Sequence, residues 1–258
     1  MIEDGEQASG AVTTVVRVGE TIRRPTGVWT PAVHALLDHL EQGGFAGAPR
    51  PRGIDEHGRE VLTLLRGEVA MRPWPAELVS GDGLWQLARW LREYHDAVAD
   101  FVPPADAAWF VPGATWQPGQ IVRHGDLGPW NSVWHDGVLV GFIDWDFAEP
   151  GAVLDDVAQL AWYAVPLRGP EMARAAGLAE DCDLRARLAA LCQGYGVSAA
   201  AVLDALEQLI AREIARLDEL GSAGVEPWST FRERGDRAAL GEELGWLIDG
   251  RSSLISDE

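Results

Sequence analysis

The sequence predicts an α+β fold in which a small β-rich N-terminal part precedes a larger, mostly helical part. Short runs rich in β-branched residues are concentrated in the first 65 residues and in one later hairpin. A stretch rich in proline and glycine, residues 66–83, follows the first strands. Beyond it, apolar residues recur mainly at helical spacing. We therefore predict two lobes, residues 1–66 and residues 67–258.

The N-terminal part should contain a hairpin, one helix and one further strand. The expected elements are a hairpin over residues 12–24, a helix over 31–42, a loop over 47–53 and a strand over 59–65. Gly19-Glu20 is expected to form the hairpin turn. We expect Thr30 to cap the helix and Gly43 to end it.

The C-terminal part should begin with a helix and a loop that lead into a second hairpin. The expected elements are a helix over residues 84–101, a loop over 102–120, strands over 132–134 and 138–143, and helices over 154–165, 183–193, 199–220 and about 233–249. The Asp136-Gly137 pair between two apolar runs is typical of a hairpin turn. Ser198 should cap the 199–220 helix and Gly221 should end it.

Charge and composition exclude several classes of partner. The formal net charge is −19, from 40 acidic and 21 basic residues, and the chain has no lysine. Nucleic acids and anionic membranes are therefore unexpected partners, because both are bound through basic side chains. No apolar run approaches the roughly 20 residues of a transmembrane helix, and the acidic N-terminus does not resemble a secretory signal. We expect a cytoplasmic protein with free thiols.

Four polar side chains are concentrated in one short span: Asp126, Asn131, Asp144 and Asp146. Carboxylates this close repel one another, so a cation should lie among them. The predicted hairpin would return Asp144 to a position near Asn131. A carboxylate and an amide oxygen suit Mg²⁺, which also keeps waters and substrate phosphates as ligands. Asp126 would then be available to accept a proton from an attacking hydroxyl group.

Two motifs in this span resemble those of a known family. HGDLGPWN, residues 124–131, and IDWD, residues 143–146, resemble the catalytic and metal-binding motifs of the aminoglycoside phosphotransferase and choline kinase-like family. That family is related to the protein kinases, whose matching motifs are H-R-D-x-x-x-x-N and D-F-G. The segment LDDVAQLAW, residues 154–162, resembles the helix that follows them in the family. The resemblance implies a protein-kinase-like two-lobed fold with a reduced N-terminal lobe.

The resemblance also implies a reaction and a set of roles. Asp126 would be the catalytic base, and Asn131 and Asp144 would bind Mg²⁺. ATP or GTP would donate its γ-phosphoryl group to a hydroxyl group of a small acceptor, and its base would lie against the connector at Leu64 and Leu65. A polycationic acceptor such as an aminoglycoside would suit an acidic protein, with LDELG and GEEL in the helical lobe as candidate carboxylate clusters.

Three further motif residues are expected to support the site. His124 should hold the catalytic loop without titrating, and Asp156 should brace that loop from the following helix. Asp146 has two readings that the sequence leaves open. It either contacts a second metal ion or water, or caps the following turn.

The chain departs from the family pattern in its N-terminal lobe. The family places a lysine on a strand, paired with a helix glutamate, but this chain has no lysine. Arg23 or Arg24 must take that role, although a planar guanidinium does not reproduce an ammonium point charge. His34 stands roughly where the glutamate is expected, and the segment GEQASGAV, residues 5–12, is a weak glycine loop. These departures keep a second hypothesis open, a pseudokinase or immunity-type binding protein with little or no turnover.

Overall fold

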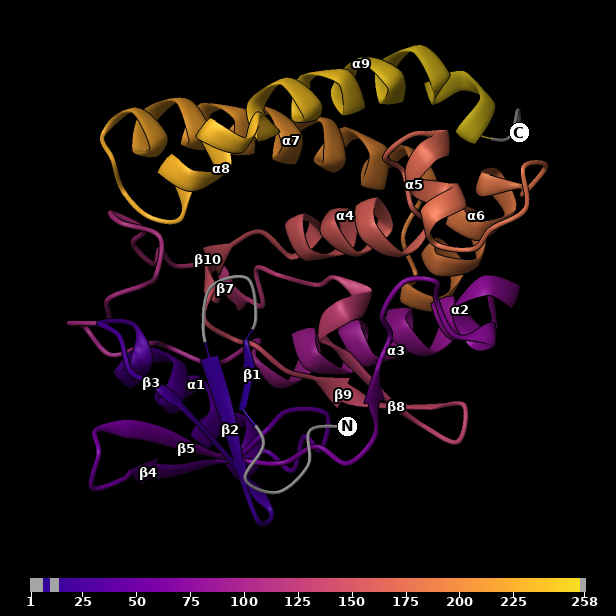
Figure 1. Cartoon of the computed structure of the whole chain (residues 1–258). Coiled ribbons are helices and arrows are strands. Elements are labelled where there is room, and N and C mark those ends of the chain that lie inside the picture. Colours follow the sequence, from indigo (N-terminus) through magenta and orange to yellow (C-terminus); the bar gives the residue numbers. More distant parts are fainter. Residues whose placement is uncertain (1–6, 10–13, 256–258) are drawn as a thin grey trace. The chain divides into compact units, whose positions relative to one another are not determined.

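The computed structural model describes residues 7–9 and 14–255 (Figure 1). The chain forms two compact units. The first comprises the residues up to Met71 together with Arg89–Asp156, and the second comprises Arg72–Ala88 together with Val157–Glu258. Within the described residues every strand lies in the first unit, whereas the second is helical. The predicted α+β class is confirmed; the lobe boundary at residues 66 and 67 stays a prediction.

A five-stranded antiparallel sheet forms the N-terminal part of the first unit. Its order is β1 (Gln7–Ser9), β2 (Thr14–Val18), β3 (Thr21–Pro25), β5 (Arg59–Thr63) and β4 (Pro51–Ile54). The hairpin predicted around Gly19-Glu20 is confirmed for the described residues, while residues 12 and 13 lie outside them. The loop prediction for 47–53 was wrong at its end, because β4 begins at Pro51. Proline is tolerated there because β4 is an edge strand.

Helix α1 (Thr30–Gln42) packs an apolar face into the first unit, as predicted. Leu36, Leu37 and Leu40 are fully buried. The predicted cap was wrong, because Thr30 is the first helical residue and its hydroxyl accepts a hydrogen bond from Gly27 N at 2.9 Å. Trp29 occupies the N-cap position without a capping side-chain bond. The helix ends at Gly43 as expected.

The second predicted hairpin is confirmed by strands β8 (Ser132–His135) and β9 (Val138–Phe142). Its turn residues, Asp136 and Gly137, have φ angles of 48° and 76°, as a tight hairpin turn requires. Besides β1 and β4, three short strands were not predicted: β6 (Glu68–Val69), which pairs with β8, and β7 (Ile121–Arg123), which pairs with β10 (Glu149–Gly151). At two or three residues each, these strands are too short to show the alternation of apolar and polar residues from which a strand is predicted.

An aromatic core in the first unit supports this hairpin. Trp90 and Tyr94 lie on helix α3 (Asp82–Ala97). The ring of Trp90 lies 4.5 Å from that of Phe142, and the ring of Tyr94 lies 5.1 Å from that of Trp145. The hydroxyl group of Tyr94 also donates to the carbonyl of Val122 at 2.6 Å. The helix ends four residues earlier than predicted, in a turn that precedes the prolines at 103 and 104.

The second unit contains the remaining helices. They are α2 (Ala76–Ser80), the greater part of α4 (Val153–Ala164), α5 (Pro170–Ala175), α6 (Leu184–Tyr195), α7 (Ala199–Ser222), α8 (Trp228–Arg234) and α9 (Asp236–Leu254). Ser198 caps α7 as predicted, but α7 continues through Gly221. The single last helix predicted at 233–249 is interrupted by Gly235, whose φ angle of 94° separates α8 from α9.

No single helix in the described part of the chain has the length and apolar composition needed to cross a bilayer; α6 and α7, which meet at a bend of 100°, meet those criteria only as a pair.

One buried guanidinium group joins three helices of the second unit. Arg187 on α6 is 6% exposed. It donates to carbonyl groups at the C-terminal ends of α2 and α4, those of Leu78 at 2.8 Å, Val79 at 3.0 Å, Ala164 at 3.1 Å and Val165 at 3.3 Å. The last carbonyls of a helix have no partner within it. Arg187 therefore satisfies backbone acceptors that would otherwise be buried without hydrogen bonds.

We expect Arg187→Leu to lower the free energy of unfolding by about 2–3 kcal/mol, because buried acceptors lose their donor. For a chain of this size the melting temperature should fall by roughly 4–12 °C. Differential scanning calorimetry would measure it. The matched control is Arg185→Leu, since Arg185 is an exposed residue of the same helix. Equal effects of the two substitutions would contradict this role.

Candidate functional site

The β8–β9 hairpin brings Asn131 and Asp144 together. Asn131 ends a 3₁₀ turn (Pro129–Asn131), and the next residue, Ser132, pairs with Phe142 across the hairpin. The N–H group of Ile143 donates to the carbonyl of Asn131 at 2.9 Å, so Asp144 emerges beside it. Asp144 has a φ angle of 64°, an uncommon conformation for a residue other than glycine. Its side chain is 39% exposed, which leaves the carboxylate accessible.

Asp126 lies next to Asn131. The side-chain amide of Asn131 donates to Asp126 Oδ2 at 2.7 Å and to the Asp126 carbonyl at 3.0 Å. The Trp130 indole N–H lies 3.5 Å from Asp126 Oδ2. Burial, and then the neighbouring Asp144 carboxylate, raise the pKa of Asp126 to about 7. The structure thus brings Asp126, Asn131 and Asp144 into one place.

A buried carboxylate braces the loop that carries Asp126. Asp156, at the start of α4, is fully buried and accepts the backbone N–H groups of His124 at 2.9 Å and Gly125 at 3.4 Å. The ring of His95, on α3, lies 3.3 Å from the same carboxylate. Burial opposes ionisation, but these hydrogen bonds and the histidine hold the pKa of Asp156 below its ordinary value. Asp156 is therefore an ionised acceptor under the loop.

His124 is fully buried and packs its ring 4.4 Å from that of Trp145. Its Nδ1 accepts the backbone N–H of Asp126 at 3.2 Å. Burial lowers the pKa of His124 to about 4, so the ring is neutral near pH 7. The resemblance implied that His124 holds the loop that carries Asp126. That role stays a prediction.

Arg24 connects the N-terminal sheet to the segment after β9 that carries Asp144 and Asp146. It is 5% exposed and lies on β3 directly across from Glu60 on β5. Its guanidinium group pairs with Glu60, with Asp144 at 2.9 Å and with Asp146. Burial alone would lower the pKa of Arg24, but the three carboxylates raise it above its ordinary value. Arg24 is therefore a permanent cation at the centre of the site.

Glu60 and Asp146 are each held by a second donor. His34, on α1, lies 2.8 Å from Glu60 Oε2, so the helix contributes a histidine to the pair instead of a glutamate. Trp29 donates its indole N–H to Asp146 Oδ1 at 2.8 Å. Burial is the largest cause that raises the pKa of Asp146, to about 6, against the opposing effect of Arg24. The sequence did not predict Glu60 and Trp29 as residues of this site.

Arg23, Leu64 and Leu65 are the other three residues predicted to contact the nucleotide. Arg23 points to the other face of β3, where it donates to Thr21 Oγ1 at 2.7 Å and lies 3.7 Å from Asp55. Leu64 and Leu65 are half-buried residues directly after β5. Their contact with a nucleotide base stays a prediction. The predicted glycine loop, residues 5–12, lies largely outside the described residues, and its described part, Gln7–Ser9, is strand β1 and not a loop.

The residues present fit a metal ion only in part. Three carboxylates, those of Glu60, Asp144 and Asp146, pair with one guanidinium group, and a fourth, that of Asp126, lies near Asp144, so additional positive charge would stabilise the site. The side-chain oxygens of Asn131 and Asp144 are hard donors that suit Mg²⁺. Over residues 7–9 and 14–255 no group of three or more histidine, cysteine or acidic residues could hold a metal ion alone. Mg²⁺ would therefore need nucleotide phosphates and waters as further ligands.

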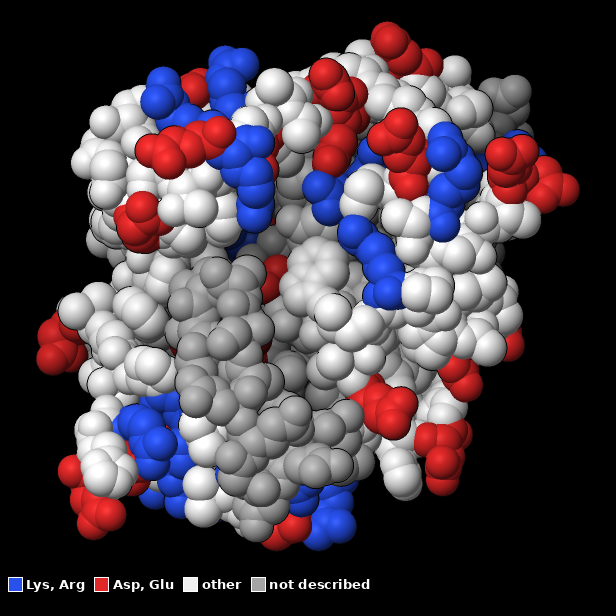
Figure 2. Space-filling view, in the orientation of Figure 1, with Lys and Arg blue, Asp and Glu red and all other residues white. Residues whose placement is uncertain are grey.

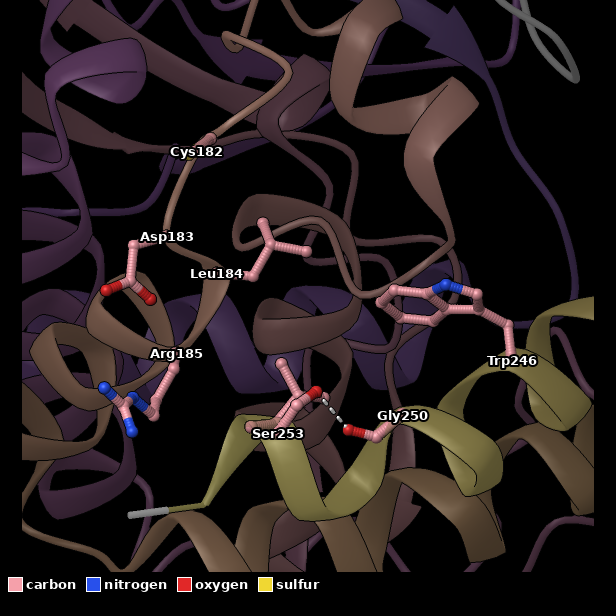
Figure 3. Close-up of a pocket in the computed structure, with 8 residues that line it drawn as sticks. Cys182, Asp183, Leu184, Arg185, Trp246, Gly250 and Ser253 are labelled. Atoms are coloured by element: carbon pink, nitrogen blue, oxygen red, sulfur yellow. Dashed lines mark hydrogen bonds between the residues drawn. The ribbon is translucent and has the colours of Figure 1, made fainter.

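The second unit contains a cavity of about 420 Å³ (Figure 3). Asp183, Arg185, Trp246 and Ser253 are among its lining residues. Asp183 already caps α6 through Ala186 N, and Ser253 donates to the Gly250 carbonyl at 2.6 Å. None of these residues belongs to the carboxylate site.

Known proteins resemble this chain in sequence. A sequence model of the phosphotransferase enzyme family matches residues 80–191. The trifolitoxin immunity protein of Rhizobium leguminosarum bv. trifolii is 37% identical over 266 aligned positions, which cover 95% of each chain. The chain belongs to the phosphotransferase enzyme family.

Solved structures of the phosphotransferase enzyme family share the fold. A Ralstonia eutropha JMP134 protein assigned as an aminoglycoside phosphotransferase superposes with a TM-score of 0.58 at 14% identity, covering 95% of this chain and 92% of the other. The GDP complex of aminoglycoside 2'-phosphotransferase-IIIa gives a TM-score of 0.54 at 14% identity, covering 98% and 93%. The predicted kinase-like fold is confirmed by these similarities.

Proposed function

We propose that this protein transfers the γ-phosphoryl group of Mg-ATP or Mg-GTP to a hydroxyl group of a small molecule. One observation carries the proposal: Asp126, Asn131 and Asp144 lie in one site, with the Asn131 amide bonded to the Asp126 carboxylate at 2.7 Å. A base beside two hard oxygen ligands is the arrangement that phosphoryl transfer needs. Membership of the phosphotransferase enzyme family supports the same reaction class.

In this reaction Asp126 accepts the proton of the acceptor hydroxyl while that oxygen bonds to the γ-phosphorus and the bond to the β-phosphate oxygen breaks. Mg²⁺, held by Asn131 and Asp144, would neutralise phosphate charge when bound. Arg24 supplies the fixed positive charge of the N-terminal sheet. Asp156 holds the catalytic loop by its two backbone hydrogen bonds, which positions Asp126.

The names of related proteins support two further parts of the proposal. The GDP complex of aminoglycoside 2'-phosphotransferase-IIIa has the same fold, which favours a nucleotide as co-substrate here. The 37% identical relative is named an immunity protein, so phosphorylation of a toxic hydroxyl compound would be a means of protection. Because nucleoside triphosphates are intracellular, we place the reaction in the cytoplasm.

A second candidate function is a binding protein of the same fold with little or no turnover. The observation that favours it is the direct pairing of Arg24 with Asp144 at 2.9 Å. A guanidinium group bonded to a metal-ligand carboxylate competes with the metal ion for that oxygen. Immunity would then come from sequestering the toxic compound.

The first test is thermal unfolding with Mg²⁺ and either ATP or GTP. A ligand at 100 times its Kd stabilises by about 2.7 kcal/mol. For this chain length the melting temperature should rise by roughly 5–11 °C. We expect the rise to require Mg²⁺ and to disappear in Asp144→Asn, which keeps the side-chain volume but loses the charge.

The same samples separate the two candidate functions. Release of nucleoside diphosphate in the presence of an acceptor, absent in Asp126→Ala, supports the kinase. A nucleotide-dependent shift without transfer to any hydroxyl acceptor supports the binding protein. No shift with either nucleotide would overturn the proposed nucleotide site.

A further inference from the structure

Three aromatic side chains form a row in the first unit. Trp29 precedes α1, Phe110 lies in the loop after α3, and Phe147 directly follows Asp146. The rings of Trp29 and Phe110 are 4.5 Å apart at 67°, and those of Phe110 and Phe147 are 4.5 Å apart at 47°. These are favourable edge-to-face and tilted geometries. All three residues are half-buried, so each keeps part of its surface accessible.

The row contacts the carboxylate site at both of its ends. Trp29 donates to Asp146 at 2.8 Å. At the other end the Phe147 backbone packs against Gly125, the residue before Asp126, so closely that a Cβ atom on Gly125 would lie 2.0 Å from the Phe147 carbonyl oxygen. The backbone that carries the Phe147 ring is therefore fixed beside the residue that precedes the proposed base.

The backbone also fixes the middle ring. Trp109 and Val111, on either side of Phe110, are buried at 4% and 6% exposure. With both neighbours anchored, the loop cannot easily withdraw Phe110 from the row. The surface is thus preorganised, which lowers the entropic cost of binding a ligand.

Charge near the row gives little support to a polycationic acceptor. Asp146 and Glu60 are buried and already paired with Arg24. In each candidate carboxylate cluster of the second unit one carboxylate is already engaged, because Asp218 pairs with Arg237 at 3.1 Å and Glu243 with Arg168 at 2.7 Å. On the face shown in Figure 2, acidic and basic side chains are interspersed.

We propose that the acceptor is a hydroxyl compound with an aromatic or flat apolar group, which packs on Trp29, Phe110 and Phe147 while its hydroxyl group faces Asp126. This inference rests on the proposed function, whose acceptor class it specifies. The rings recognise the acceptor through apolar burial and edge-to-face contacts. The carboxylates take part in phosphoryl transfer and not in recognition.

The test uses two neutral probes that differ in one ring, N-acetylserine benzylamide and N-acetylserine methylamide, with kanamycin as the polycation. Saturation-transfer NMR would measure binding of each with and without Mg-nucleotide. We expect the benzylamide to bind more tightly than the methylamide by about 2- to 12-fold, the range of an aromatic contact of about 0.5–1.5 kcal/mol. Phe110→Leu and Phe147→Leu should each remove most of that difference.

The control is Phe101→Leu, because Phe101 is a buried ring of the same unit that packs on His39 and not on the row. Equal binding of the two amides, tighter binding of kanamycin, or equal effects of all three leucine substitutions would overturn the inference. Failure of the proposed function would be seen separately, as the absence of a rise in melting temperature with Mg-nucleotide. The NMR measurement without nucleotide would still decide whether the three rings bind an aromatic group.

Discussion

Arg24→Met is expected to lower the free energy of unfolding of the first unit by about 3–5 kcal/mol, the usual effect of removing one partner from a buried ion pair. The guanidinium group is 5% exposed and bonds to Glu60, Asp144 and Asp146. Methionine fills much of the volume but leaves Glu60 and Asp146 buried without their cation. Chemical unfolding in urea, followed by tryptophan fluorescence and circular dichroism, would measure the change.

The adjacent residue is the matched control. Arg23→Met removes the same charge from the same strand, but Arg23 is only partly buried and lies 3.7 Å from Asp55. Its effect should stay below about 1 kcal/mol, because the ion pair is long and no buried carboxylate depends on Arg23 alone, since Asp55 also pairs with Arg59. If Arg24→Met were no more destabilising than Arg23→Met, Arg24 would not be the central cation of the site.

The sequence predicted the approach of the 124–131 loop to the hairpin because its information is local. The spacing from His124 to Asn131, and the Asp136-Gly137 turn, place Asp144 beside Asn131 without reference to the rest of the chain. Asp156 was also found from a short motif. It lies in the first turn of α4, a helix that follows the hairpin and β10 closely along the chain, and from there it contacts the loop.

Local sequence patterns could not identify Arg24 as the buried cation or Glu60 as its partner. Arg23 and Arg24 are equivalent in sequence, and only the alternation of side chains along β3 directs one of them inward. Glu60 is 36 residues from Arg24, and the pair forms because the β3–β5 register sets them opposite each other. His34 was noted as a departure from a helix glutamate, but its bond to Glu60 depends on how α1 packs.

Fold elements were missed where tertiary contacts outweigh local pattern. Strand β6 has two residues, and β7 and β10 have three each. They exist through their partners, as Arg123 and Glu149 illustrate, because these two buried residues are paired across β7 and β10. Helix α2 likewise falls within a segment whose proline and glycine content indicated a connector.

Asp126→Asn is expected to lower phosphoryl transfer by about 10²- to 10⁴-fold, the usual contribution of a positioned acid–base group. Asparagine keeps the shape of the side chain and can still accept the Asn131 hydrogen bond, so the loop should keep its conformation. It cannot take the hydroxyl proton. The readout is product formed from radiolabelled nucleotide, beside the Mg²⁺-dependent thermal shift, which should be unchanged because Asp126 is not needed to hold the nucleotide.

Asp136→Asn is the control for this substitution, because Asp136 is an exposed turn residue of the neighbouring hairpin with a φ angle of 48°, which asparagine also tolerates. It should leave both readouts intact. A variant Asp126→Asn that retained more than about a tenth of wild-type transfer would contradict proton acceptance by Asp126, since even the low end of that contribution is 10²-fold. If the variant lost the thermal shift as well, its effect would be on nucleotide binding, and the separation between Asp126 as base and Asn131 and Asp144 as metal ligands would be wrong.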